Sequence, residues 1–200
     1  MPSGSESITA VVLAGGASRR MGTPKAQLVL NGSTLLRRVC TAAVESGVSD
    51  CVVVGGQPGW ADSHAIGVAT RWTPDKYPGD GPLGGVVTAL IEVTTEWMLV
   101  LSCDLVSVQA AALRTMISFA DDGIDAVVPL GHRREVLHAL YRTEAIRPVT
   151  GRFLAGARNM AAVLDGIRVR EIPVPSTGVL ARSTRDVDTP EEFNEVVTEE

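Results

Sequence analysis

Basic residues and glycines are concentrated in one short segment near the N-terminus. The sequence LAGGASRRMGTPK, residues 13–25, contains three glycines, two arginines and one lysine. Glycines such as Gly15 and Gly16 let backbone N–H groups approach an anion closely, while Arg19 and Lys25 supply positive charge. We therefore expect the segment to bind a polyphosphate, with Lys25 and Arg19 as catalytic residues.

Two common phosphate-binding motifs are absent from this segment. It lacks the Gly-Lys-Ser/Thr of a Walker A loop and the G-x-G-x-x-G of dinucleotide-binding proteins. Kinase and dehydrogenase functions therefore lose their main support. The structural alternative is a glycine-rich turn with solvated arginines. The continuous apolar run of residues 8–14 favours the phosphate loop, because such loops follow a buried strand.

Aspartates at two places could hold a metal ion. Asp104 follows the apolar run of residues 97–101, so its carboxylate should lie at the carboxyl end of a central strand, where α/β sheets bind ligands. Beside a triphosphate it would be a third catalytic residue, binding Mg²⁺, which takes only one or two protein carboxylates. Asp186 or Asp188 could complete the metal shell. The alternative for each aspartate is capping of the helix that follows it.

A second glycine-rich segment, Gly81-Pro82-Leu83-Gly84-Gly85, forms a rigid turn into a helix, with Asp75 shortly before it. Its small residues permit close approach of a flat ring, so Gly81, Pro82 and Leu83 are candidates for nucleotide binding. A tight loop without a ligand is the alternative. Together with Gly15 and Gly16, the segment would form a backbone-lined slot that suits guanine better than cytosine.

Strand and helix patterns alternate along the chain, which predicts βαβ units. Strands are expected at residues 8–14, 51–54, 97–101 and 126–128, and helices at residues 34–46, 83–92, 107–120, 153–164 and 191–197. Ser33 is the expected N-cap of the first helix and Gly47 its C′ residue. We predict one domain over residues 1–200, with a mostly parallel sheet in a three-layer α/β/α fold and with residues 1–7 disordered.

Composition excludes several classes of function. The net charge of -5 and the isoelectric point near 5.3 provide no basic surface for nucleic acid or an anionic membrane. No apolar run reaches the ~20 residues that span a bilayer, and no signal peptide is recognised. Three cysteines without close spacing suggest neither disulfides nor zinc, so a cytoplasmic location is expected.

The motifs together resemble a known family. LAGGASRRMGTPK is similar to the signature of the nucleotidyltransferase superfamily, which includes sugar-1-phosphate and molybdopterin nucleotidyltransferases. GPLGG resembles the GPLAG element of the molybdenum cofactor guanylyltransferases, which are MobA-like enzymes. The resemblance continues through Cys103-Asp104, DAVVP at 125–129, HALYR at 138–142 and DTPEEF at 188–193, and therefore covers nearly the whole chain.

The resemblance implies a Rossmann-like nucleotidyltransferase fold and transfer of GMP from GTP to the terminal phosphate of molybdopterin or the molybdenum cofactor. Pyrophosphate would be released. Other cofactor-biosynthesis proteins and molybdenum apoenzymes are possible partners. Mg²⁺ is the implied cofactor, on Asp104. The residues implied to bind GTP are Leu13, Ala14, Gly15, Lys25, Asp75 and Asp104.

Three departures from the family pattern leave alternatives open. Thr23-Pro24 precedes Lys25 where guanylyltransferases commonly have Asp, Val106 replaces a usual Pro, and Asp186 and Asp188 replace two asparagines. The first and third departures resemble cytidylyl-transferring relatives. A CTP-dependent molybdopterin cytidylyltransferase, a sugar-1-phosphate nucleotidyltransferase and a catalytically silent nucleotide-binding module are therefore the alternatives.

Overall fold

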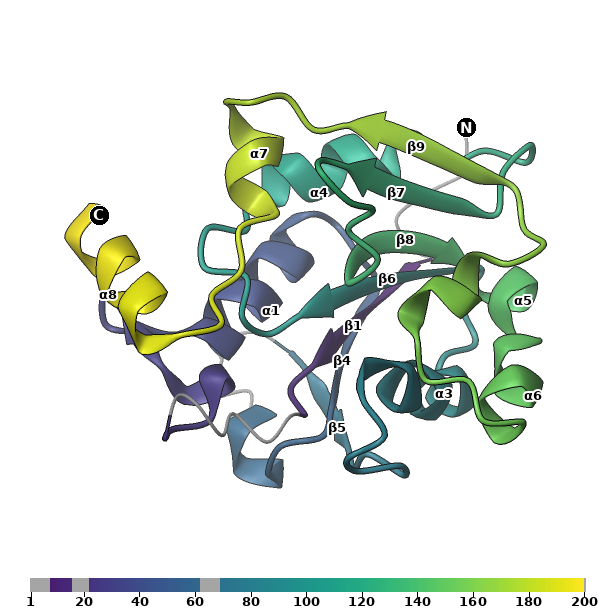
Figure 1. The fold of residues 1–200 in the computed structure, drawn as a ribbon, viewed down its shortest axis with the longest axis horizontal. Coiled ribbons are helices and arrows are strands. Elements are labelled where there is room, and N and C mark those ends of the chain that lie inside the picture. The colour runs from purple at the N-terminus through teal and green to yellow at the C-terminus, as the bar shows by residue number, and fades with distance from the viewer. Residues whose placement is uncertain (1–7, 16–21, 62–68, 200) are drawn as a thin grey trace.

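The computed structural model describes residues 8–15, 22–61 and 69–199, and Figure 1 shows their arrangement. The expectation of disorder for residues 1–7 lies outside these ranges, as do the predicted site residues Gly16 and Arg19. A seven-stranded sheet forms the centre, in the order β5-β4-β1-β6-β8-β7-β9. Its strands are β1 (Ile8–Leu13), β4 (Asp50–Val54), β5 (Arg71–Thr73), β6 (Trp97–Ser102), β7 (Ala126–Leu130), β8 (His138–Arg142) and β9 (Val169–Pro173).

The sheet is mostly parallel, as predicted. β1 lies between β4 and β6 and runs parallel to both, with Leu13 opposite Val54 on one side and Ser102 on the other. β8 is the exception, since it runs antiparallel to both β6 and β7. All six residues of β1 are buried, which explains its continuous apolar sequence.

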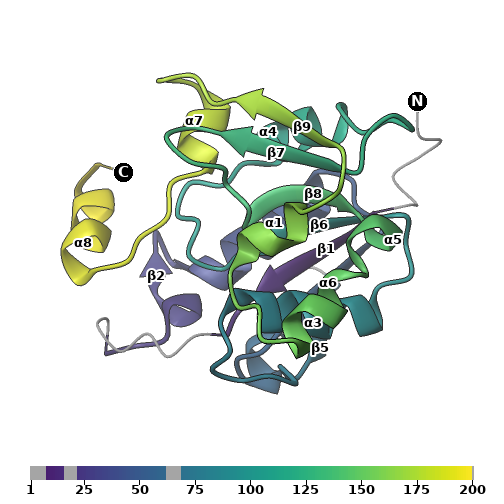
Figure 2. The ribbon, with the colours of Figure 1, turned by 45° about the vertical axis from the view of Figure 1, so that its right-hand side comes forward.

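Helices cover both faces of the sheet, so the fold is a three-layer α/β/α sandwich (Figures 1 and 2). One face packs on α1 (Leu35–Glu45) and α4 (Ala110–Ile117), and the other packs on α3 (Pro82–Glu92) and α6 (Val149–Leu154). Alternate strand residues serve the two cores: Val12 belongs to the first and Val11 to the second. The other helices of the described residues are α5 (Thr143–Ile146), α7 (Val179–Ser183) and α8 (Pro190–Glu199), with short 3₁₀ turns η2 (Lys25–Gln27), η3 (Pro58–Ala61) and η4 (Met160–Leu164).

A third, smaller core attaches the C-terminal helix to the rest of the molecule. The hairpin β2 (Val29–Leu30) and β3 (Ser33–Thr34) turns through Asn31 and Gly32, both with positive φ. Leu30 packs there with residues of α1, of the segment after β6 and of α8. This core holds the segment before α8 near the carboxyl end of β6.

Three of the predicted helices differ from the structure. The N-cap of α1 is Thr34, the last residue of β3, whose side chain accepts a hydrogen bond from the Arg37 N–H, so Ser33 is not the N-cap. Gly47 does follow the helix with φ of 95°, as expected of a C′ residue. The helix predicted at residues 107–120 is confined to α4.

The helix predicted at residues 153–164 is wrong. α6 ends at Leu154, and Gly156 has a φ of 106°, a left-handed conformation that breaks the helix. The later apolar residues of that pattern, Met160 and Leu164, are buried by η4 instead.

None of the helices in the described ranges combines the length and the apolar character that a membrane span requires.

Candidate active site

Three adjoining cavities lie at the carboxyl ends of the central strands. Ser102, the last residue of β6, lines all three of them. Gly15 is shared by the largest and the smallest cavity, and Asp104 by the smallest and the third. The edge of the sheet predicted to bind ligands is therefore hollowed into three adjoining cavities, which together we call the cleft.

The largest cavity, of about 740 Å³, is lined mainly by glycines and prolines. Because the sequence predicts that a flat ring binds between its two glycine-rich segments, we call it the base cavity. A Cβ on Gly55, where φ is 81°, would lie 3.1 Å from the Gly15 backbone, so only glycine keeps this wall open. Its lining comprises Leu13, Gly15, Val54, Gly55, Gly56, Pro74, Asp75, Pro78, Gly79, Gly81, Pro82, Gly85, Ser102 and Leu137. Its volume suits a small-molecule ligand.

Most of the residues predicted to bind nucleotide meet in this cleft. Leu13, Gly15, Asp75, Gly81 and Pro82 line the base cavity. Ala14 and Lys25 line the smallest cavity, of about 180 Å³. The exception among the described residues is Leu83. It is a residue of α3 that is fully buried in the core between this helix and the sheet, and it lines none of the three cavities.

Asp75 presents one carboxylate oxygen to the base cavity. Its Oδ1 accepts hydrogen bonds from the Tyr77 N–H at 2.9 Å and from the Thr88 hydroxyl at 3.2 Å. Its Oδ2 faces Gly15, whose Cβ, if present, would lie 3.6 Å away. In the described part of the chain, Oδ2 accepts no hydrogen bond. A hydrogen-bond acceptor therefore lies on the wall of the base cavity.

Lys25 joins two carboxylates from distant parts of the sequence. Its Nζ donates to Asp104 Oδ2 at 2.8 Å and to Asp188 Oδ1 at 2.6 Å. Burial alone would lower the pKa of Lys25, but the hydrogen bonds to the two aspartates raise it. The second oxygen of Asp104 accepts a hydrogen bond from the Ser102 hydroxyl. We call Lys25, Asp104 and Asp188 the charged cluster.

The C-terminal helix is capped by Thr189 and Glu192, not by an aspartate. The Thr189 hydroxyl accepts from the Glu192 N–H at 3.2 Å, and the Glu192 carboxylate accepts from the N–H groups of Asp188 and Thr189. This reciprocal arrangement is a capping box. The side chain of Asp188 is thus available to the charged cluster. Asp104 caps no helix either, because α4 begins only at Ala110.

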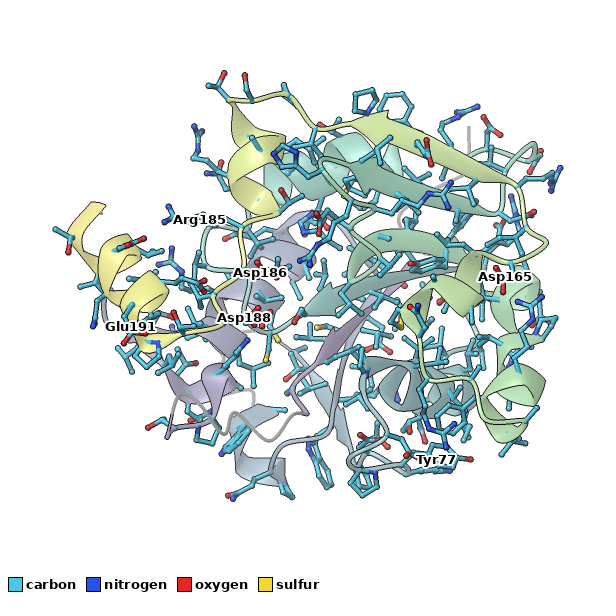
Figure 3. All side chains as sticks on the ribbon, in the orientation of Figure 1. Tyr77, Asp165, Arg185, Asp186, Asp188 and Glu191 are labelled. Atoms are coloured by element: carbon cyan, nitrogen blue, oxygen red, sulfur yellow. The ribbon has the colours of Figure 1, made fainter. Side chains whose placement is uncertain are left out.

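Asp186 and Asp188 lie on the segment that joins α7 to α8, beside the end of β6 (Figure 3). Asp186 bonds to Arg133 at 3.3 Å rather than to Lys25. Burial raises the pKa of Asp186, and the negative charges of Asp104 and Asp188 act in the same direction.

Among the described residues, no cluster of three or more histidine, cysteine, aspartate or glutamate side chains is arranged to hold a metal ion.

The third cavity, of about 430 Å³, carries arginines that the sequence analysis did not identify, and we call it the arginine cavity. Arg133 and Arg134 come from the loop before β8, and Arg158 comes from the segment after α6. Arg158 is held 3.3 Å from Asp80 and stacks over the Phe153 ring at 4.3 Å. The pair of arginines in GHRREV was the one available signal, since nothing local relates Arg158 to this site.

Comparisons with known proteins agree with this geometry. Residues 10–171 match the family model described as the MobA-like NTP transferase domain. A probable molybdenum cofactor guanylyltransferase of Opitutus terrae is 31% identical over 182 residues, covering 88% of each chain. One of a Geobacillus species is 28% identical and covers 94% of this chain and 97% of its own.

A solved structure shares the fold. It is the molybdopterin-guanine dinucleotide biosynthesis protein A of Archaeoglobus fulgidus, with a TM-score of 0.75 and 22% identity, covering 96% of this chain and 100% of its own. The fold is thus the nucleotidyltransferase fold that the motifs predicted. Together with the family match over most of the chain, it identifies this protein as an enzyme of the MobA-like NTP transferase family.

Proposed function

We propose that the protein transfers GMP from GTP to the terminal phosphate of molybdopterin, or of its molybdenum-loaded form, and releases pyrophosphate. The single observation that carries the proposal is that three cavities adjoin at Ser102, which lines all of them. A base, a chain of phosphates and an acceptor phosphate can occupy neighbouring compartments. The names of the relatives, probable molybdenum cofactor guanylyltransferases, support guanylyl transfer. The name of the solved structure refers to the synthesis of molybdopterin-guanine dinucleotide.

Guanine is the base that fits the base cavity best. Its Watson–Crick edge carries two adjacent donors, N1–H and the 2-amino group, and Asp75 Oδ2 is an acceptor facing the cavity. Cytosine would bring its N3 acceptor to the same edge, beside a negative charge. A buried group left unpaired costs about 1–3 kcal/mol, so one such mismatch gives discrimination of about tenfold or more.

The charged cluster is suited to triphosphate and to a hard metal ion. The Lys25 ammonium can turn from the two aspartates to phosphate oxygens as a ligand enters the smallest cavity. The two aspartates then present oxygen ligands of the kind Mg²⁺ prefers, in the small number it requires. When bound there, Mg²⁺ would neutralise charge on the phosphates and the leaving pyrophosphate.

The arginine cavity is the proposed site of the acceptor. Arg133 and Arg158 provide guanidinium groups for an anionic substrate, and Asp104 connects this cavity to the smallest one. A phosphate monoester has its second pKa near ~6, so the acceptor is largely ionised at neutral pH. For this reason the reaction requires no general base from the protein.

In the reaction, an acceptor phosphate oxygen forms a bond to the α-phosphorus of GTP, and the bond from that phosphorus to the bridging oxygen of pyrophosphate breaks. Lys25 and the arginines hold the two anions together against their mutual repulsion. Positioning and charge neutralisation supply most of the rate in such transfers.

We place the reaction in the cytoplasm, because the three cysteines are buried free thiols, which suits a reducing compartment.

The test is release of pyrophosphate from GTP, CTP or ATP with molybdopterin as the acceptor, and with glucose 1-phosphate in its place. The proposal predicts release with molybdopterin and the largest kcat/KM for GTP. A CTP value equal to or above the GTP value would identify a cytidylyltransferase. Release with the sugar phosphate alone would identify a sugar nucleotidyltransferase. No release with any pair would leave a nucleotide-binding module that serves cofactor-biosynthesis proteins or molybdenum apoenzymes.

A further inference from the structure

Asp75 can distinguish bases only if its carboxylate is held in one orientation. The residue lies in the segment between β5 and α3, where a free side chain would rotate and expose either oxygen. The contacts that prevent this come from the Tyr77 N–H and from Thr88, a residue of α3 that is completely buried. Thr88 does not line the base cavity.

The segment of residues 75–77 is pressed onto α3 at a position without a side chain. A Cβ on Gly84 would lie 3.1 Å from the Tyr77 Cβ, so glycine is what allows this approach. The Tyr77 ring makes an edge contact with Phe153 of α6, with 4.8 Å between ring centroids, and Figure 3 labels Tyr77 at this side of the molecule. The close approach brings Thr88, one turn further along α3, within reach of Asp75.

The Thr88 hydroxyl has both of its hydrogen-bonding roles occupied. It accepts from the Lys76 N–H at 3.1 Å, and it donates to Asp75 Oδ1 at 3.2 Å. Because its oxygen is the acceptor for a backbone donor, its single proton is directed toward the carboxylate. The Thr88 hydroxyl and the Tyr77 N–H together occupy both lone pairs of Asp75 Oδ1. Oδ2 is then the oxygen that faces the cavity beside Gly15.

We propose that Thr88 is a positioning residue for base selection: its hydroxyl locks Asp75 so that Oδ2 faces the base edge of the bound nucleotide. The inference rests on the proposed function, which assigns the base cavity to guanine. Thr88 touches no ligand in this assignment and acts only through Asp75. Residues that contact the base are thus not the only ones that determine which base is used.

The experiment measures dissociation constants for GTP and CTP, each with Mg²⁺, by isothermal titration calorimetry. Thr88→Val removes the hydroxyl and keeps the shape, whereas Thr88→Ser keeps the hydroxyl. The matched control is Thr143→Val, since Thr143 is equally buried and its hydroxyl has no partner in the described structure. Thermal melts of all variants report whether folding is retained.

We expect Thr88→Val to weaken GTP binding by about tenfold, as for the loss of one hydrogen bond to a charged group, and to change CTP binding by less than about twofold. Thr88→Ser and Thr143→Val should bind both nucleotides as the wild type does. In an Asp75→Asn background, Thr88→Val should have no further effect, because the residue acts through that carboxylate.

Equal loss of GTP and CTP affinity in Thr88→Val would overturn the proposal, as would an effect of Thr88→Ser as large as that of Thr88→Val. Additive effects of Thr88→Val and Asp75→Asn would also overturn it. A wild-type protein that prefers CTP would contradict the proposed function alone. In that case a change in the ratio of the GTP and CTP dissociation constants in Thr88→Val would keep the role of Thr88, and an unchanged ratio would overturn it.

Discussion

Lys25 Nζ lies 2.6 Å from Asp188 Oδ1, so the segment after the N-terminal loop meets the segment before the last helix. The same ammonium lies 2.8 Å from Asp104 Oδ2. One positive charge thus holds together the two carboxylates that we assign to the metal. In the nucleotide-free protein, the Lys25 ammonium would compete with the proposed divalent cation for the same oxygens.

Replacing the lysine should separate its two effects. We expect Lys25→Met to lower turnover with saturating GTP on the order of 10²–10³-fold, through loss of a phosphate contact. The same change should tighten binding of Mn²⁺ to the nucleotide-free protein, because the competing charge is gone. Turnover assays and calorimetry check the two results. Arg71→Met is the control, since it breaks an arginine–aspartate pair at the other end of the sheet and should change neither value. Unchanged turnover in Lys25→Met would contradict its role.

Asp188→Asn should raise the Mg²⁺ concentration needed for half-maximal turnover by about tenfold, equivalent to about 1.4 kcal/mol of metal binding. An amide is a weaker ligand than a carboxylate for a hard cation. Asp104→Asn should cost more, because Asp104 is the more buried member of the cluster. Asp165→Asn is the control, because Figure 3 shows Asp165 at the right-hand side of the molecule and Asp188 left of its centre. Superimposable Mg²⁺ titrations of wild type and Asp188→Asn would show that Asp188 is not a ligand.

Gly15→Ala should weaken GTP binding by about tenfold or more with little change in the melting temperature. The backbone of Gly15 does not require glycine, but the added methyl group would stand 3.6 Å from Asp75 Oδ2 and cover it. Gly59→Ala is the matched control, because a Cβ there meets no atom within 4 Å. Calorimetric titration with GTP checks the effect. If Gly15→Ala binds GTP as the wild type does, the base edge does not approach Asp75.

The free energy of unfolding should decrease as the pH is lowered, because of a buried histidine. His138 is 1% exposed, its ring nitrogens have no partner in the described structure, and burial lowers its pKa to about 4. Since the unfolded chain binds a proton near pH 6.5 and the folded chain does not, stability is lost as the pH falls from about 6.5 to about 4, by on the order of 3 kcal/mol.

The variant His138→Leu should lack this part of the pH dependence, and the exposed His132→Leu should keep it. Free energies of unfolding from urea titrations at several pH values between 7 and 4 check the difference. The same slope in His138→Leu and wild type would mean that His138 is protonated in the folded protein.

Much of the active-site edge follows from sequence alone. The apolar run before Gly15 predicted a buried strand, and the run before Asp104 predicted another whose end carries a carboxylate. Both strands are central and adjacent in the structure, and Asp104 lies in the charged cluster. The prediction succeeded because a continuous apolar run has few other stable arrangements, and parallel strands bring their carboxyl ends to one edge.

Local patterns were less informative where two signals compete. Ser33 and Thr34 are both good N-caps by residue type, and only the structure shows that the hairpin strand runs through both of them and that the helix begins after Thr34. The apolar spacing after Phe153 suited a helix, but the left-handed turn at Gly156 broke it. In both cases the local preference was weak enough for neighbouring structure to override it.

Contacts between distant segments came from the tertiary structure alone. Asp188 had two roles that the sequence could not separate, helix cap or charged-cluster member. Thr189 and Glu192 cap the helix by a capping box, and the packing of α8 against the β2–β3 hairpin brings the Asp188 carboxylate to Lys25. Sequence spacing reports which residues can share a helix face or a strand end. Sequence spacing does not report which distant charges meet. That depends on how the connecting segments run across the sheet, and their course is set by the packing of the whole core.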